Sequence, residues 1–384
     1  MLAALLLLMA LGVAFVYSAT MANESSALLP WYKQNYFKQT VWYELGLAAA
    51  AVLCLVDYHT VSRWSLVAYW TTIVLLIAVF LFGKKVYGAT RWIDVGFFQL
   101  QPSEFAKLSV ILVLAHFLSR PIDELRLRGN FFKALGLIAL PFILILKEPD
   151  LGSALVLLPV GLMMLYAAGT PRRYLVQLMG MVAVLMSLLV ADILFAPKNL
   201  RIPLQEYQRQ RLLVFFGKDF APKNATLEQR QRARELQRDR SYNVEQALIS
   251  VGSGGLAGKG WRHGTQNALG FLPRAVAHND FIFSVIAEEE GFVGSVIVIT
   301  LYAVILFSGI KIAGEARDRL GKLLAVGVVA MLFSHVFINI GMNIRIMPVT
   351  GVPLPLLSYG GSSVLCSLIA IGLLQNVYIY RRAY

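Results

Sequence analysis

Long apolar runs separated by short polar turns occupy most of this chain. A helix needs about 20 apolar residues to cross a bilayer without help. Some of the runs hold only 15–16 residues, so their flanking turns must complete the span or the helix must lie inside the protein. Ten runs are predicted to form helices: 2–18, 41–56, 64–82, 104–118, 132–146, 151–168, 174–196, 291–310, 323–341 and 360–380.

The composition supports the same interpretation. Hydrophobic residues make up 58% of the 384 positions and charged residues 15%, against about 45–50% and about 25% in ordinary soluble domains. The first run has no positively charged segment before it, so we interpret it as a spanning helix and not as a signal peptide. Cys54 and Cys366 lie in apolar runs and form no disulfide framework. The predicted fold class is therefore an all-α polytopic membrane protein.

The distribution of lysine and arginine predicts an orientation. If the loops after helices 2, 4, 6 and 8 and the C-terminal tail are cytoplasmic, they carry 13 basic residues, against seven in the short loops on the other side. Because basic residues favour the cytoplasmic side, we expect both termini in the cytoplasm. Membrane lipids are expected partners, and nucleic acid is not.

One connection, 197–280 between helices 7 and 8, is exceptionally long. It holds 14 basic and seven acidic residues. Long loops cross membranes largely regardless of their charge, so an extracytoplasmic location is compatible with this content. Within it, Thr226 and Gln229 fit a capping box and predict a helix over 226–241, lying in water or among lipid headgroups.

Two short stretches place charges beside predicted helices. In "RWIDVGFFQLQPSEFAKL" (91–108) Glu104 and Lys107 share a helix face. They form either an internal ion pair or part of a polar cavity, which is where charges inside a membrane protein usually face. In "ILKEPDLGSA" (145–154) solvated charges of a short turn would explain Lys147, Glu148 and Asp150 without any function.

Two further stretches are predicted to be irregular. "GSGGLAGKGW" (252–261) lacks the glycine spacing of a phosphate loop, and it is either a flexible turn or a cradle of backbone amides for an anionic group. The prolines of "NIRIMPVTGVPLPLLSYGGSS" (343–363) exclude a helix. Irregular backbone near membrane depth lies inside protein or lines a wet cavity, so this segment is a cavity wall or a simple loop. His116 and His335 are expected to be hydrogen-bonded core residues and not metal ligands.

The stretch "AVAHNDFIFSVIAEEEGF" (275–292) places four acids beside a spanning run. Segment 281–290 is too short to span and is predicted to be re-entrant or interfacial. Asp280 either caps this piece or lies at the mouth of a polar cavity as a general base. Because the preceding loop is basic, we expect nearby cations to lower the pKa of Asp280 and keep it ionised. Glu288–Glu290 are expected to form hydrogen bonds or to pair with basic groups that shape the cavity.

Four stretches taken together resemble the SEDS family (shape, elongation, division and sporulation). They are 91–108, "KEPDLGSALV", "GSGGLAGKGWRHGTQNALGFLPRAVAHNDFIFSVIAEEEGFVG" and "PVTGVPLPLLSYGGSS". The resemblance implies a single transmembrane domain over 1–384, with about ten helices and 197–280 as its large extracytoplasmic loop. The third stretch is more similar to the rod-elongation branch, RodA, than to the division branch, FtsW. The chain departs from the family at 217–241, which is longer and more charged, and at Asn279, where threonine is common.

The resemblance implies a peptidoglycan glycosyltransferase that polymerises lipid II for cell elongation and cell shape. Asp280 matches the family's essential acid and would take the proton of the acceptor hydroxyl. Lys107, Arg91 or Arg274 would stabilise the departing pyrophosphate. Further substrate contacts are expected at Glu104, Lys147, Asp150, Glu288, Ser358 and Ser362.

The resemblance also implies a partner, a class B penicillin-binding protein with transpeptidase activity. No cofactor is indicated, and the residues leave open whether a divalent cation assists. Two other functions fit ten helices with internal charges: a flippase or transporter for lipid-linked precursors, and a scaffold that only holds the transpeptidase. The halves of the chain show no inverted repeat, which weakens the transporter hypothesis.

Overall fold

The computed structural model describes residues 1–21, 30–86, 89–94, 96, 99–195, 206–218, 220, 226–272 and 276–381. Each of the ten predicted runs forms a helix there, so the predicted all-α membrane fold is confirmed. Seven of these helices are long and apolar enough to cross a membrane, and α9 is a shorter apolar helix. The ten are α1 (Leu2–Met21), α3 (Asn35–Leu55), α5 (Ser65–Phe82), α6 (Pro102–Leu118), α8 (Arg128–Lys147), α9 (Leu151–Ala167), α10 (Arg172–Phe195), α14 (Ile282–Glu315), α15 (Arg319–Asn343) and α16 (Gly361–Tyr380).

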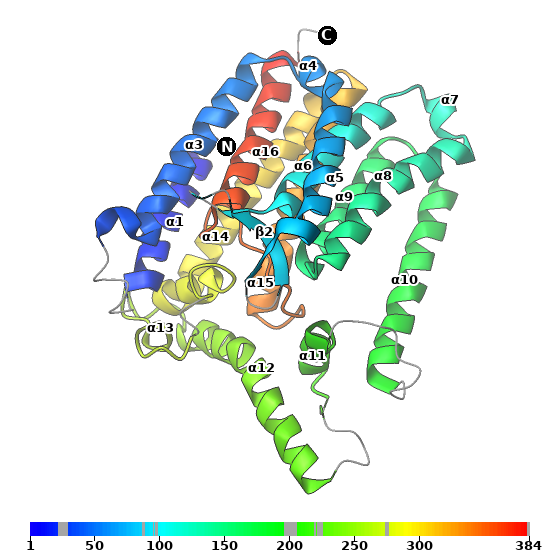
Figure 1. Cartoon of the computed structure of the whole chain (residues 1–384). Helices are drawn as coiled ribbons and strands as arrows, with labels where there is room; N and C mark the ends of the chain where they lie inside the picture. The colour runs from blue at the N-terminus through cyan, green and yellow to red at the C-terminus, as the bar shows by residue number, and fades with distance from the viewer. Residues whose placement is uncertain are drawn as a thin grey trace.

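The helices form one bundle (Figure 1), and α15 and α16 are the most enclosed of its seven long apolar helices. α16 packs against α3, and α15 packs against α14 and α9. α10 is the opposite case: only 11% of its apolar window is buried, and its main contacts are with α9 and α11 (Glu206–Phe215). It stands apart at the edge of the bundle in Figure 1. An apolar helix with so little protein around it presents its surface to lipid.

Several short elements join the long helices. A small antiparallel sheet has the order β1-β2-β3, and Ile93 of its central strand lies opposite Leu100. These strands are too short for a sequence pattern to reveal. The short elements outside the long loop are η1 (Trp31–Lys33), α4 (Tyr58–Arg63), α7 (Ile122–Leu125), β1 (Lys84–Val86), β2 (Ala89–Asp94) and β3 (Gln99–Leu100).

The long loop is largely helical where it is described. The helix predicted over 226–241 is confirmed as α12 (Leu227–Ser253), which extends 12 residues further than predicted. Thr226 and Gln229 form both hydrogen bonds of the capping box. α12 points away from the bundle (Figure 1). The loop also contains α11 and α13 (Thr265–Ala268), which the sequence did not predict.

α14 contains an interruption that divides it into two helices. Gly291 has φ 65° and ψ −158°, a conformation that only glycine adopts readily. A Cβ there would also lie within 2.3 Å of the Gly258 nitrogen. The predicted short piece 281–290 before a separate span is therefore confirmed, with Phe281 as the N-cap of the helix. Nearly all of this piece is buried inside the protein, and its re-entrant or interfacial position stays a prediction.

The proline-rich segment after α15 is non-helical, as predicted, and it lies inside the protein. Tyr43 and Tyr302 donate hydrogen bonds to the carbonyls of Leu356 and Pro355. Asn339 of α15 donates to the Val352 carbonyl at 2.8 Å. Buried side chains thus satisfy carbonyls that a helix would have satisfied, as irregular backbone at membrane depth requires.

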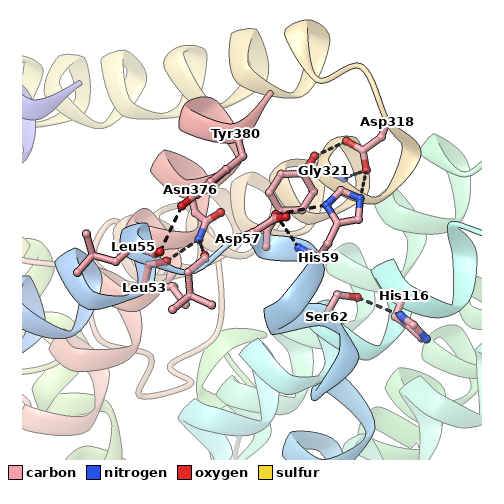
Figure 2. Close-up of polar contacts among 12 residues, drawn as sticks. Leu53, Leu55, Asp57, His59, Ser62, His116, Asp318, Gly321, Asn376 and Tyr380 are labelled. Atoms are coloured by element: carbon pink, nitrogen blue, oxygen red, sulfur yellow. Dashed lines mark hydrogen bonds and ion pairs between the residues drawn. The ribbon is translucent and has the colours of Figure 1, made fainter. Parts of the chain in front are cut away.

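At the end of the bundle that carries the C-terminus, polar side chains join the ends of α3, α4, α6, α15 and α16 (Figure 2). His59 lies between Asp57 (3.3 Å) and Asp318 (3.4 Å). Asn376 of α16 donates to the Leu53 and Val56 carbonyls at the end of α3. Ser62 is 3.0 Å from Nδ1 of His116, so His116 is hydrogen-bonded between two helices, as expected. Its side chain is exposed, however, and the expectation that it is a core residue is wrong. These contacts hold the helix ends together.

Candidate active site

Asp280 is held by its main chain and not by its side chain. Its carbonyl accepts hydrogen bonds from Nδ2 of Asn339 (3.0 Å) and Nδ2 of Asn343 (3.1 Å). Within the described part of the chain, its carboxylate makes no hydrogen bond or ion pair. The N-cap of α14 is Phe281, without a side-chain cap. The hypothesis that Asp280 is a helix cap is therefore wrong.

The proline-rich segment approaches the Asp280 carboxylate closely. Gly351 has φ +76°, and a Cβ at this position would lie 3.4 Å from Oδ2 of Asp280. Ser358 fastens the two segments to each other, because its Oγ donates to the Asn279 carbonyl (2.6 Å) and accepts from Leu354 N (2.8 Å). The segment therefore forms a wall beside the carboxylate, which supports the predicted role as the side of a cavity.

The structure brings two arginines to Asp280 from distant parts of the sequence. Arg91 comes from β2, and Arg211 comes from α11. Arg211 also donates to the Val349 carbonyl at 3.3 Å, so it lies on the same proline-rich wall. Both charges favour the ionised carboxylate. Burial has the larger effect, however, and together with the charge of Asp150 it raises the pKa of Asp280 above its usual range. The expectation that the effect of the cations would exceed that of burial is therefore wrong.

Asp150 anchors Arg91 at 3.7 Å. Its carboxylate also accepts from Gln101 Nε2 (3.1 Å), Ser103 Oγ (3.1 Å) and Ser153 N (3.2 Å). Burial opposes ionisation, but the Arg91 charge and the Ser153 hydrogen bonds hold the pKa of Asp150 below its usual range. A buried, ionised Asp150 can therefore fix the position of the Arg91 guanidinium.

The interpretation of 147–150 as a turn of solvated charges is wrong for two of its three charged residues. Glu148 and Asp150 are each only 1% exposed, and Lys147 alone is exposed. Neither carboxyl oxygen of Glu148 has a hydrogen-bond partner among the described residues. Burial, with a further contribution from the charge of Asp150, raises the pKa of Glu148 to about 9. Glu148 is therefore protonated at neutral pH. The structure places Lys147 away from the Arg91–Asp150 pair.

Glu104 and Lys107 form an ion pair of 2.6 Å inside the protein. Lys107 Nζ also lies 2.8 Å from Nε2 of His335, so His335 is a partnered core residue, as expected. None of the three side chains is more than 3% exposed, and none faces lipid. Lys107 is close enough to Asp150 to favour its ionised form. The pair is thus electrostatically connected to the residues around Asp280, and a cavity shared with Asp280 stays a prediction.

The glycine-rich stretch folds over the glutamates of α14. Lys259 Nζ lies 2.6 Å from Oε1 of Glu288, and Gln266 N donates to the same oxygen at 2.9 Å. The Lys259 and Gly260 amides donate to the carbonyls of Glu288 and Glu289. These amides already have acceptors, which contradicts the interpretation as a cradle for a bound anion. The pairing expected for Glu288 is confirmed, and Glu289 accepts from Ser18 Oγ at 2.5 Å.

For three residues that were predicted to contact the substrate, the structure does not test the prediction. The hydroxyl of Ser362 joins the Gln101 amide (3.1 Å) to the Gln99 carbonyl (3.2 Å). Both Ser362 and Ser358 are therefore engaged with the main chain, and contact with a substrate stays a prediction for each. Arg274 lies outside the described residues.

Sequence reasoning missed three residues around Asp280. Asn339 and Asn343 lie four apart in an apolar helix, and this spacing puts both on one face. Polar residues of a spanning helix usually face the protein interior, so this signal was available. Arg211 gave no such signal, because it lies in a strongly basic loop whose fold brings it to the site.

Comparison with known proteins places the chain in a family. A family model described as "Cell cycle protein", covering FtsW, RodA and SpoVE, matches residues 1–383. The chain belongs to this family. The predicted SEDS membership is therefore confirmed, and the chain is a multi-pass membrane protein of a bacterial family.

Two relatives show how similar the whole chain is to characterised members. It is 36% identical to the peptidoglycan glycosyltransferase MrdB of Escherichia coli (strain K12), over 88% of this chain and 84% of MrdB. It is 33% identical to the peptidoglycan glycosyltransferase RodA of Treponema pallidum (strain Nichols), over 97% of this chain and 95% of that protein. These matches are consistent with the predicted rod-elongation branch.

Solved structures share the fold. A chain of a peptidoglycan synthase complex that coordinates polymerization and crosslinking matches with a TM-score of 0.74 and 29% identity, over 99% of this chain and 98% of that chain. The rod shape determining protein RodA of Thermus thermophilus matches with a TM-score of 0.64 and 29% identity, over 98% and 96%. The bundle described above is thus the fold of this family.

Proposed function

We propose that this protein is a peptidoglycan glycosyltransferase that polymerises lipid II during cell elongation, with Asp280 as its general base. Family membership and the names of the relatives support the reaction class. One observation supports the assignment of the base: the Asp280 main chain is clamped by two asparagines, while its carboxylate has no partner among the described residues and lies near two arginines. A structural carboxylate would be hydrogen-bonded instead.

In this reaction Asp280 accepts the proton of the acceptor's GlcNAc 4-hydroxyl. The oxygen then attacks the anomeric carbon of the donor's MurNAc and forms the new glycosidic bond. The bond from that carbon to the lipid pyrophosphate breaks, and the configuration inverts from α to β. The raised pKa makes the Asp280 carboxylate a stronger base, because a base is most effective when its pKa is near the working pH. One base is enough, since a bound acceptor replaces the activated water of inverting hydrolases.

Arg91 and Arg211 are the cations proposed to stabilise the departing pyrophosphate. Preorganised positive groups stabilise charge that develops on a leaving group. Asp150 positions Arg91, and the carbonyl of Val349 positions Arg211. Lys107 is paired with Glu104 and contacts His335, so we assign it to the support of Asp150 and not to the pyrophosphate. No step in this proposal requires a divalent cation.

We propose that residues 1–384 form one transmembrane domain of the bacterial inner membrane, with both termini cytoplasmic and 197–280 outside. The excess of basic residues at the other end of the bundle supports this orientation. Cysteines introduced at exposed positions test it. A membrane-impermeant maleimide added to intact cells should label Arg230→Cys and should not label Arg126→Cys. The reverse pattern would contradict both the topology and the external location of Asp280.

The reaction is tested with purified protein and lipid II. Gel analysis of the products should show glycan polymer with the wild type and none with Asp280→Asn. A flippase would retain activity in that variant, and a scaffold would produce no polymer in either form. We also propose a class B penicillin-binding protein as partner, on the basis of the family and of the related synthase complex. Its co-purification with Asp280→Asn at the wild-type level would show that the variant is folded.

A further inference from the structure

A basic cavity lies at the far end of α9 from the proposed active site. It has a volume of about 430 Å³ and is lined by Arg126, Tyr166, Gly169, Thr170, Pro171 and Arg172. Asp150 precedes the first residue of α9, whereas Tyr166 lies in its last turn. The 17 residues of this helix separate the cavity from the Asp280 region by about 25 Å. The cavity therefore has no part in the reaction proposed above.

The polar groups of the cavity are suited to an anion. Arg126 is exposed, and the carboxylate nearest to it, that of Asp123, is 3.9 Å away. Their side chains are 67% and 95% exposed, and such exposed pairs are weak, so Asp123 leaves the charge available. Thr170 is only 7% exposed. Thr170 lines the cavity, and among the described residues the hydrogen bond that it makes is from its backbone amide to the Leu165 carbonyl, not from its hydroxyl.

Apolar surface adjoins the same cavity. The beginnings of α8 and α10 lie side by side, because the rings of Phe131 and Tyr174 stack at 5.2 Å. Around this contact Leu127, Phe132 and Val176 are more than 60% exposed. α10 continues from there as the least enclosed spanning helix (Figure 1). Basic groups therefore lie directly beside a surface that faces the lipid chains.

We propose that this cavity binds the phosphate of an anionic phospholipid, with Arg126 and Arg172 contacting the phosphate and α8 and α10 contacting the acyl chains. Basic pockets between transmembrane helices bind anionic headgroups in this way. Guanidinium groups match the geometry of phosphate oxygens, and the Thr170 hydroxyl can donate to a third oxygen. A free phosphate ion would use the same polar groups, but it would not use the apolar surface beside them.

The test compares two double variants that lose the same charge at the same end of the bundle. Arg126→Gln/Arg172→Gln removes the cavity's cations. Arg317→Gln/Lys322→Gln removes two exposed cations elsewhere and serves as the control. Binding of phosphatidylglycerol and phosphatidylcholine to purified protein is measured by native mass spectrometry. The cavity variant should bind phosphatidylglycerol at least about tenfold more weakly than wild type, the scale of a lost charged hydrogen bond, and the control should bind it like wild type.

Three outcomes would overturn the proposal. Equal losses in both double variants would indicate attraction by general surface charge. Equal binding of phosphatidylcholine and phosphatidylglycerol would exclude an anionic headgroup site. Competition by soluble glycerol 3-phosphate at the affinity of the lipid would indicate a site for a soluble anion. Thr170→Val, which removes only the hydroxyl, should give a smaller loss in the same direction, and unchanged melting temperatures show that all variants are folded.

Discussion

Asp280 and Glu288 lie eight residues apart, yet their carboxylates differ in burial and in hydrogen-bond partners. Glu288 is fully buried and is bound by Lys259, Thr265 and the Gln266 amide. Asp280 retains some exposure, and its carboxylate has no such partner within the described chain. Buried acids with several hydrogen bonds stabilise a structure, whereas an acid without partners contributes little to folding and keeps its oxygens available. The contrast agrees with the proposed function, in which Glu288 supports the site and Asp280 reacts.

The largest expected effect is a difference in polymerisation rate between variants of the two acids. Asp280→Asn should lower the rate of lipid II polymerisation about a hundredfold or more, the usual scale for loss of a general base. Glu288→Gln keeps most of the hydrogen bonds and should lower the rate much less. Rates are measured with purified protein and labelled lipid II. If Asp280→Asn kept more than about a tenth of the wild-type rate, the base would have to be another acid.

A second comparison concerns the cations beside the two acids. Arg211→Gln should lower polymerisation by roughly tenfold, the value of one charged contact to a leaving group, with a melting temperature close to that of wild type. Lys259→Gln should lower the melting temperature strongly and the polymerisation rate little. It leaves the buried Glu288 charge without its counter-ion, and broken buried pairs are strongly destabilising. Both variants are assayed for rate and for thermal unfolding. If both variants changed the rate and the melting temperature in the same way, the distinction between a reactive and a supporting acid would be wrong.

The raised pKa of Asp280 predicts how stability depends on pH. The folded protein keeps this proton at pH values where the unfolded chain, with an aspartate pKa of about 3.9, has released it. Folding is therefore favoured at low pH, and this contribution is lost as the pH rises through the raised pKa. Asn cannot ionise, so Asp280→Asn should melt a few degrees above wild type at neutral pH and show no difference near pH 4. Activity of the wild type should fall as the pH decreases through the same pKa.

Substitution of Glu148 should have the smallest effect on activity, and it tests whether every acid without a partner is reactive. It is also buried without a partner among the described residues, but its pKa of about 9 keeps it protonated. A neutral isostere should replace it, so Glu148→Gln should change the polymerisation rate by less than about threefold. Its stability advantage over wild type should increase from about pH 5 to pH 9, because over this range the unfolded wild-type chain releases the Glu148 proton while the folded protein keeps it. A large loss of activity would instead assign Glu148 a part in the reaction.

The sequence was sufficient for the helices, for a physical reason. A bilayer demands continuous apolar runs, so each spanning helix is visible locally, and even the break at Gly291 followed from the short run before it. Asp280 was singled out by the basic loop before it, by the three acids behind it and by the family resemblance, with a helix cap as the alternative. The small sheet of β1–β3 was missed because strands of two to six residues carry no usable period.

What could not be predicted depends on contacts between distant segments. Arg211 reaches Asp280 only because α11 folds back onto the proline-rich wall, and nothing in its own sequence indicates this. The burial of Glu148 and Asp150 was also invisible, because a charged turn of four residues usually lies in water. The direction of the Asp280 pKa was predicted wrongly for the same reason. The balance between burial and charge depends on the surrounding fold, and a count of basic residues in the loop does not describe it.

The clamp formed by Asn339 and Asn343 has an evolutionary consequence. Because it grips the carbonyl of residue 280, any amino acid at this position can be held in the same place. A single substitution there can abolish the chemistry without disturbing the bundle. A duplicated gene in this lineage could therefore encode an inactive regulator after one substitution. That protein would still bind the partner protein in place of the active enzyme.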